Sequence, residues 1–167
     1  MPDLTHPLNG NTYNEAFLTE AFRLAAQSMQ ANQGGPFGAV VVIDDKIIGT
    51  GVNQVTSKND PTAHAEIMAI RDACKKLNRF DLRGAVIYST CEPCPMCFSA
   101  IYWAGIQRVF YASTREDAAA IGFKDSWIYD EIGKEPTGRT VNFQRVIHPA
   151  APRLFSDWDA KQDKISY

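Results

Sequence analysis

The feature that most constrains this chain is a pair of short motifs, His64-Ala65-Glu66 and Pro93-Cys94-Pro95-Met96-Cys97. Zinc in hydrolytic sites takes three protein ligands and leaves its fourth tetrahedral position to water, whose pKa falls to about 7. The imidazole and the two thiols therefore predict that His64, Cys94 and Cys97 hold one Zn²⁺ per chain. Glu66 would lie beside that metal, and we predict that it carries protons and is not a ligand. Any fold of this chain must bring both motifs to one point.

A closed structural zinc site is the alternative, with Cys91 as a fourth ligand three residues before Cys94. A chain of 167 residues with 45% hydrophobic content should bury a core without help from a metal. A structural site also has no use for Glu66. We therefore expect a catalytic site, with Cys91 near the metal but not bound to it. Cys74 is predicted to be a small buried apolar residue.

Size and charge exclude several classes of protein. A length of 167 residues predicts one domain, and 17 basic against 19 acidic side chains provide no strong field for a nucleic acid. The longest apolar run, residues 39–43, is far shorter than the ~20 residues that span a bilayer. The first residues lack an export signal, and three of the four cysteines fall within seven positions, which is not a disulfide framework. These features predict a cytoplasmic protein without a membrane or nucleic-acid partner.

Apolar and turn-forming residues alternate in a pattern typical of an α/β protein. Residues 1–12 show no apolar period and are predicted to be a loose lead-in to a single domain over residues 13–167. A capping-box pattern of Thr12 and Glu15 predicts a helix to about residue 29, and Asp60-Pro61-Thr62 predicts the start of a second helix that ends near residue 78. The predicted strands span residues 37–43, 46–52, 84–90, 107–112 and 141–147, and the further helices residues 94–104, 114–120 and 126–132.

The spacing within the two motifs limits where the metal can lie. His64 and Glu66 are two residues apart and cannot share a face of a regular helix, so they can converge only at its first turn. Cys94 and Cys97 are three apart and lie on one face at the start of the next helix. We therefore predict that both helices point their N-terminal ends at the metal. The positive ends of the helix dipoles favour negative charge at that place.

Three more residues are candidates for ligand contacts. Phe37 follows a double glycine and could face a planar ligand, or it could simply begin a strand in the core. Asn53 follows the second strand, where its amide could hold a turn or bind the edge of a purine. Asp125 precedes a helical turn and could be its N-cap. All of these alternatives are open on spacing alone.

With these motifs placed, the chain resembles the cytidine deaminase superfamily and, within it, the bacterial guanine deaminases, from about Tyr13 to the end. The two metal-site motifs would also fit tRNA adenosine deaminases and cytosine deaminases. The more specific segments are Gly34-Gly35-Pro36-Phe37-Gly38-Ala39, Ser57-Lys58-Asn59-Asp60-Pro61-Thr62, Ala100-Ile101-Tyr102-Trp103, Ile121-Gly122-Phe123-Lys124-Asp125-Ser126 and the terminal Tyr167. This resemblance implies a three-layer α/β/α fold with a central five-stranded mixed sheet.

The resemblance also implies roles for single residues. Asn53 would hydrogen-bond a purine whose ring lies between Phe37 and Trp103, and Asp125 would meet the amino group and help proton transfer. The C-terminal segment from about residue 149 would cross to a partner subunit, so that Tyr167 closes the neighbouring pocket in a domain-swapped homodimer. The implied substrate-binding residues are Phe37, Asn53, Ala65, Trp103 and Tyr167.

The reaction implied is the zinc-dependent hydrolysis of guanine to xanthine and ammonia. Zinc-bound hydroxide would attack C2 while Glu66 protonates N3, and Glu66, aided by Asp125, would then protonate the leaving amine. The alternatives are a deaminase of guanosine, another nucleobase or tRNA adenosine deaminase, and a zinc-stapled binding module without turnover. The balanced charge of the chain counts against tRNA.

Overall fold

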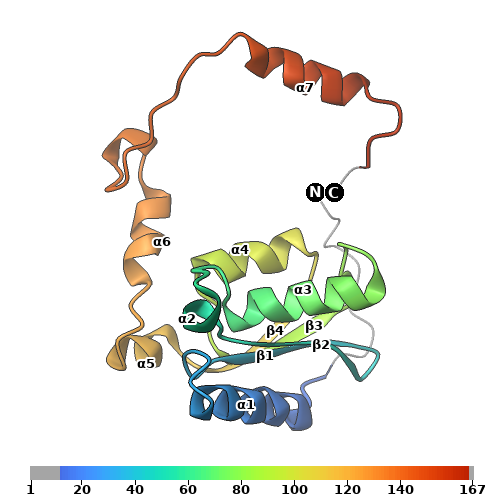
Figure 1. Ribbon diagram of the computed structural model, residues 1–167, viewed down its shortest axis with the longest axis vertical. Helices are drawn as coiled ribbons and strands as arrows, with labels where there is room; N and C mark the ends of the chain where they lie inside the picture. Colours follow the sequence, from blue (N-terminus) through green and yellow to red (C-terminus); the bar gives the residue numbers. More distant parts are fainter. Residues whose placement is uncertain (1–11, 166–167) are drawn as a thin grey trace. The chain divides into compact units, whose positions relative to one another are not determined.

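The computed structural model describes residues 12–165, and the chain divides into two compact units, Met1–Ser126 and Trp127–Tyr167. The first unit contains a mixed sheet of four strands in the order β2-β1-β3-β4 (Figure 1). Strand β1 pairs antiparallel with β2 and β3, while β3 and β4 are parallel. The elements of this unit are α1 (Glu15–Gln30), β1 (Gly38–Ile43), β2 (Lys46–Val52), α2 (Val55–Lys58), α3 (Ala65–Leu77), β3 (Val86–Cys91), α4 (Pro95–Trp103), β4 (Arg108–Ser113) and α5 (Arg115–Ala120).

Helices cover both faces of this sheet, with α1 on one face and α3 and α4 on the other (Figure 1). Successive side chains of a strand point to opposite faces, so Val41 packs in the cluster that includes Ala69 of α3, while Val40 packs in the cluster that includes Ala21 of α1. Burial on both faces explains the unbroken apolar run of β1. The predicted α/β/α layering is confirmed for this unit.

The prediction of a fifth strand over residues 141–147 is wrong, because the sheet has four strands and this segment is not in a ladder anywhere in residues 12–165. Val146 and Ile147 are 76% and 90% exposed. Alternating apolar and polar residues show only that a segment suits a half-buried surface. A strand also needs a partner edge, which the local pattern of apolar residues does not specify.

Two predicted helix starts differ from the structure. Asn14, not Thr12, caps α1 by accepting the N–H of Ala16 at 3.0 Å. Helix α3 begins at Ala65 instead of at residues 60–62, because Asp60 accepts the N–H of Thr62 at 2.8 Å in a separate turn. This later start makes His64 the N-cap of α3, as the convergence of the two motifs requires.

Close packing of α3 on β2 sets the position of the first motif. A Cβ atom on Gly51 would lie 2.0 Å from the carbonyl oxygen of Ala65 and 2.4 Å from the nitrogen of Ala69. Only glycine allows the helix to approach the strand this closely. The hairpin before it turns at Asp44 and Asp45, both with positive φ as its tight turn requires.

The second unit contains most of α6 (Ser126–Gly133), the 3₁₀ turn Pro136–Gly138 and helix α7 (Ala150–Ala160). Glu131 organises its first part, since its carboxylate accepts the N–H of Thr140 at 2.6 Å and pairs with Lys134 at 2.6 Å. The apolar side chains of α7, Leu154, Phe155 and Trp158, are all exposed in the chain. Every helix within residues 12–165 is too short or too polar to span a lipid bilayer.

Candidate functional site

Two helix N-termini meet at the site. His64 is the N-cap of α3 and Cys94 is the N-cap of α4, where Pro95 occupies the first helical position and needs no partner for an N–H. Glu66 and Cys97 follow within the first turn of each helix, and both are buried. The predicted convergence at the positive ends of two helices is thus confirmed.

The geometry of the three ligand residues fits a tetrahedral zinc ion. The Nδ1 atom of His64 lies 3.5 Å from the sulfur of Cys94 and 3.6 Å from that of Cys97. Zinc bonds of about 2.3 Å to sulfur and about 2.05 Å to nitrogen at tetrahedral angles would hold such ligand atoms about 3.6 Å apart. The three ligand atoms all lie within 4.8 Å of one another. His64, Cys94 and Cys97 can therefore hold the metal without rearrangement.

Cys91 does not complete a closed site. Among the described residues, the group that could hold a metal comprises the three predicted ligands and no fourth. The Cys91 thiol instead contacts the carbonyl oxygen of Thr114 at 3.5 Å, and burial raises its pKa to about 11. A neutral thiol that binds a carbonyl is a neighbour of the site, as predicted, and one coordination position is left for water. Cys74, predicted to be buried, is half-buried in the structure.

The ligand thiols share their protons unequally before a metal binds. The hydrogen bond from Cys97 lowers the pKa of Cys94 to about 4, while the same pairing, together with burial, raises the pKa of Cys97. Interaction with Cys94 also raises the pKa of His64. Metal ligands must be deprotonated, so binding of a cation releases the remaining protons of this cluster.

Glu66 is only 6% exposed and touches the ligand cluster. Its carboxylate lies 3.4 Å from the sulfur of Cys97 and accepts a hydrogen bond from the hydroxyl of Ser89 at 3.3 Å. Burial raises the pKa of Glu66 above that of an ordinary carboxyl. A carboxyl with a raised pKa beside a metal site is suited to take up and release protons.

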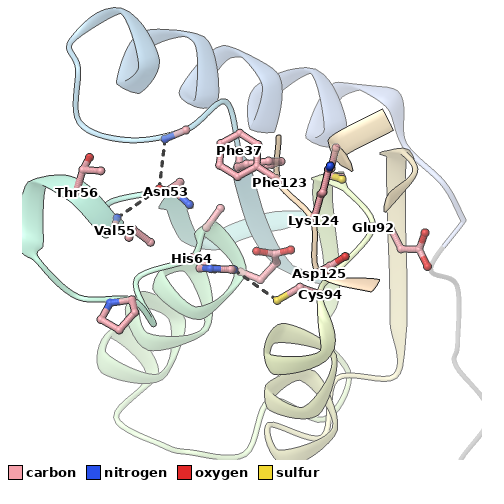
Figure 2. Close-up of a pocket in the computed structure, with 16 residues that line it drawn as sticks. Phe37, Asn53, Val55, Thr56, His64, Glu92, Cys94, Phe123, Lys124 and Asp125 are labelled. Atoms are coloured by element: carbon pink, nitrogen blue, oxygen red, sulfur yellow. Dashed lines mark hydrogen bonds between the residues drawn. The ribbon is translucent and has the colours of Figure 1, made fainter. Parts of the chain in front are cut away.

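These residues open into a cavity of about 420 Å³, a size that suits a small heterocycle (Figure 2). The structure brings Phe37, Asn53, Ala65 and Asp125 into its lining, together with the metal ligands His64 and Cys94 and with Glu66. Its other lining residues are Gly35, Val55, Thr56, Pro61, Cys91, Glu92, Ala118, Phe123 and Lys124.

Asn53 uses its two amide ends differently. Its Oδ1 atom accepts the N–H groups of Gly35 and Val55, each at 3.3 Å, so the amide does hold the turn. Figure 2 shows the amide nitrogen directed away from these two bonds, toward the pocket. A Cβ atom on Gly34 would lie 2.6 Å from Oδ1, so glycine is needed beside it. Asn53 therefore presents hydrogen-bond donors, and the matching edge of a ligand must accept.

Phe37 and Asp125 line the same pocket although they are far apart in the sequence of the first unit. Phe37 packs against the core and also against Phe123, whose ring meets it edge to face at a centroid distance of 4.8 Å. Asp125 is half-buried, and burial, followed by the nearby Cys94, raises its pKa. The pocket therefore combines an aromatic wall with two acidic groups of raised pKa.

Some residues lie where sequence reasoning did not place them. Trp103 is the last residue of α4 and is 70% exposed, outside the pocket lining of its own chain. Tyr167 falls outside the described residues. Phe123 and Glu92 line the pocket but were not predicted. The sequence could have indicated Phe123 as a pocket residue. Residues two apart in an extended segment share a side, and the candidate Asp125 follows Phe123 at that spacing.

A model of the cytidine and deoxycytidylate deaminase zinc-binding region matches residues 11–113. The layered fold and the His/Cys/Cys cluster agree with it, and the chain belongs to this family of zinc-dependent deaminases.

Within that family, the guanine deaminase of Bacillus subtilis is 49% identical over 92% of this chain and 99% of its own length. The X-ray structure of a Bacillus subtilis guanine deaminase matches with a TM-score of 0.90 and 48% identity, over 93% of this chain and 99% of that chain. A guanine deaminase structure from Nitrosomonas europaea matches with a TM-score of 0.64 and 30% identity, over 74% of this chain and 71% of that one. The tRNA-specific adenosine deaminase of Bacillus subtilis is 35% identical over only 61% of this chain and 63% of its own length.

Proposed function

We propose that this protein hydrolyses guanine to xanthine and ammonia with one bound Zn²⁺. The observation that carries the proposal is the pocket itself, in which two of the three clustered metal ligands, a buried carboxyl and an amide donor line a space of about 420 Å³. The resemblance to guanine deaminases over almost the whole chain supports guanine as the substrate.

Zinc at the ligand cluster would supply a nucleophilic water at neutral pH. Glu66 lies beside that cluster, so it can deliver a proton to ring N3 and afterwards to the leaving amine. The raised pKa of Glu66 helps because the group must both hold and release a proton. Asp125, on the other wall, would meet the exocyclic amino group and assist the second transfer.

Recognition of the base would use the remaining lining residues. The amide donors of Asn53 match the acceptor atoms on one edge of guanine, its carbonyl oxygen and ring nitrogens. Phe37, held edge to face by Phe123, would lie against the purine ring, with Ala65 beside it. A free base needs no extrusion from a duplex, which agrees with a net charge of −2.

The second unit would act in a homodimer. Leu154, Phe155 and Trp158 form an exposed apolar face on α7, and a face of this kind normally packs against something. In the proposed arrangement one deaminase domain spans residues 13–167, and its segment from about 149 is swapped onto the partner subunit. Tyr167 and Trp103 would then complete a pocket in the dimer. We place the enzyme in the cytoplasm, without a nucleic-acid partner.

The test is an assay of purified, zinc-loaded protein with guanine, guanosine, adenine and cytosine offered separately and ammonia release measured. Guanine should be the preferred substrate by kcat/KM. Equal or better turnover of guanosine or adenine would contradict the proposal, and so would no turnover of any base. The Glu66→Gln variant with equal zinc content is the matched control for contaminating activity.

A further inference from the structure

Two loops meet next to the metal-binding motif of α4, one after β3 and the other after β4. Strands β3 and β4 are parallel neighbours, and their carboxyl ends bring residues 91–92 against residues 113–115. The main chain of Glu92 donates its N–H to the carbonyl oxygen of Ser113 at 2.8 Å. The side chain of Glu92 accepts the N–H of Arg115 at 3.3 Å. One residue of the metal-binding loop thus binds both sides of the start of α5.

The side-chain bond fills a specific gap in the capping of α5. The first N–H groups of a helix have no partner within it. Thr114 and Asp117 form a capping box, in which the Thr114 hydroxyl accepts the N–H of Asp117 at 3.2 Å and the Asp117 carboxylate accepts that of Thr114 at 2.8 Å. The N–H of Arg115 is not part of this box. Glu92 binds it from a different element.

The other end of α5 leads directly into the pocket wall. The N–H of Phe123 bonds to the carbonyl oxygen of Ala118 at 3.0 Å, and Gly122 has a φ of +99°, which forms a tight end to the helix. Phe123 then packs on Phe37, and Asp125 reaches the cavity two residues later. Hydrogen bonds thus close both ends of this six-residue helix, and the pocket residues follow its C-terminal end directly.

We propose that Glu92 is a positioning residue that, through helix α5, holds Asp125 over the reacting base. Glu92 would act through its hydrogen bond to the backbone of Arg115 and not through contact with the substrate. The inference deepens the proposed function, because it rests on Asp125 meeting the amino group there. It predicts that geometry, and not charge, is what the enzyme needs at residue 92.

The test compares Glu92→Ala with Glu92→Gln in the zinc-loaded, full-length protein. A glutamine oxygen can still accept the N–H of Arg115, so Glu92→Gln should keep kcat and KM within about twofold of the parent, as only a bond to a charged acceptor is weakened. Glu92→Ala should lower kcat about tenfold with little change in KM, within the ~100-fold that small misplacements can cost. Zinc content should stay at one per chain in both, and Glu116→Gln, an exposed acid on α5, is the matched control.

A double-mutant cycle identifies the route of the effect. In an Asp125→Asn background, Glu92→Ala should cost less than about twofold, because the group that it positions is already disabled. The same tenfold cost in that background would overturn the proposal. A Glu92→Gln variant as impaired as Glu92→Ala would also overturn it, because charge would then be the requirement. Loss of zinc from Glu92→Ala would overturn it as well, since Glu92 would then act on the metal ligands.

Hydrogen exchange separates this inference from the proposed function. Without any substrate, Glu92→Ala should speed amide exchange in residues 115–125 at least about fivefold over the parent, and Glu92→Gln should not. Unchanged exchange in Glu92→Ala overturns the positioning role even if guanine is turned over. Faster exchange supports it even if the true substrate is another base.

Discussion

The two units of this chain use their apolar residues in opposite ways. In residues 12–126, side chains such as Ile87 are completely buried between a sheet and its covering helices. In residues 127–165, side chains such as Leu154 and Ile147 are largely exposed. A short amphipathic helix such as α7 gains most of its stability from tertiary packing. The first unit therefore contains its own support, whereas the apolar side chains of the second unit are left largely exposed.

This difference also divides the chemistry. All residues that line the metal pocket come from the first unit, between Gly35 and Asp125. The ligands are held by helix starts that the buried sheet orients, so the metal site does not depend on α7 for its geometry. Changes in the first unit should therefore affect catalysis or folding directly, and changes in the second should act through association of the proposed homodimer.

The largest effect is expected from Glu66→Gln, which leaves the shape of the site but removes the proton carrier. We expect kcat to fall about 10²- to 10⁴-fold, the usual contribution of general acid–base catalysis. Zinc content, measured by atomic emission, should stay at one per chain because Glu66 is not in the ligand set. Turnover that survives the change would show that Glu66 does not carry the protons.

The next effect contrasts Ile87→Ala with Leu154→Ala. Removing the buried Ile87 side chain should lower the free energy of unfolding by about 2 to 5 kcal/mol, because it leaves a cavity in the core. At a dilution at which the protein is monomeric, Leu154→Ala should change it by less than about 0.5 kcal/mol. Denaturant titration measures both. A large loss in monomeric Leu154→Ala would end the contrast between the two units.

Deletion of Ser166 and Tyr167 tests the proposed role of the second unit. If the chain terminus closes a partner's pocket, KM for guanine should rise at least about tenfold, equivalent to about 1.4 kcal/mol of lost binding. The unfolding transition should not move if these residues act only to close the pocket. Steady-state kinetics checks the first expectation and thermal denaturation the second. Unaltered kinetics would rule out a closing role for these residues.

The smallest effect concerns a polar link in the first unit. Asp72 of α3 accepts the N–H of Thr50 at 2.9 Å and pairs with Lys76 at 2.7 Å. Burial acts to raise the pKa of Asp72, but the bonds from Lys76 and Thr50 outweigh it and lower that pKa. We expect Asp72→Asn to cost about 1 kcal/mol of unfolding free energy near neutral pH.

The pH dependence of this cost follows from the direction of the pKa shift of Asp72. Because folding lowers the pKa of Asp72, its stabilisation is present above the carboxyl's ordinary pKa and disappears as pH falls through the folded-state value. The parent and Asp72→Asn should therefore converge in stability as the pH falls below 3.8, the ordinary pKa of the carboxyl. Asp159→Asn, at an exposed pair with Lys164 in the second unit, should leave the melting temperature unchanged. A difference in unfolding free energy between the parent and Asp72→Asn that does not change with pH would show that the charged carboxylate of Asp72 is not the stabilising group.

Much of the first unit could be predicted from short-range patterns. Strands β1 to β4 and helices α1 and α3 to α5 occur within a few residues of their predicted positions, because apolar period and turn residues are local signals. Residues 141–147 carry the same kind of signal but form no strand. Strand pairing depends on a partner edge, which local sequence does not specify.

The sequence by itself determined the chemistry of the metal site. Residues two apart do not share a face of a regular helix, so His64 and Glu66 can converge only at a helix start, and the structure places them there. Cys94 and Cys97 are three apart and share a face, and they lie at the start of α4.

Only the tertiary structure decided how the pocket is walled. Three contacts of the wall join segments that are 18 residues or more apart. They are the packing of Phe123 on Phe37, the bond from Gly35 to the Asn53 amide and the bond from Arg115 to Glu92. The bond from Val55 to Asn53 is local. The meeting of the distant segments depends on which strands lie side by side and how closely helices approach them. Such contacts follow from packing of the whole unit, and no local spacing encodes them.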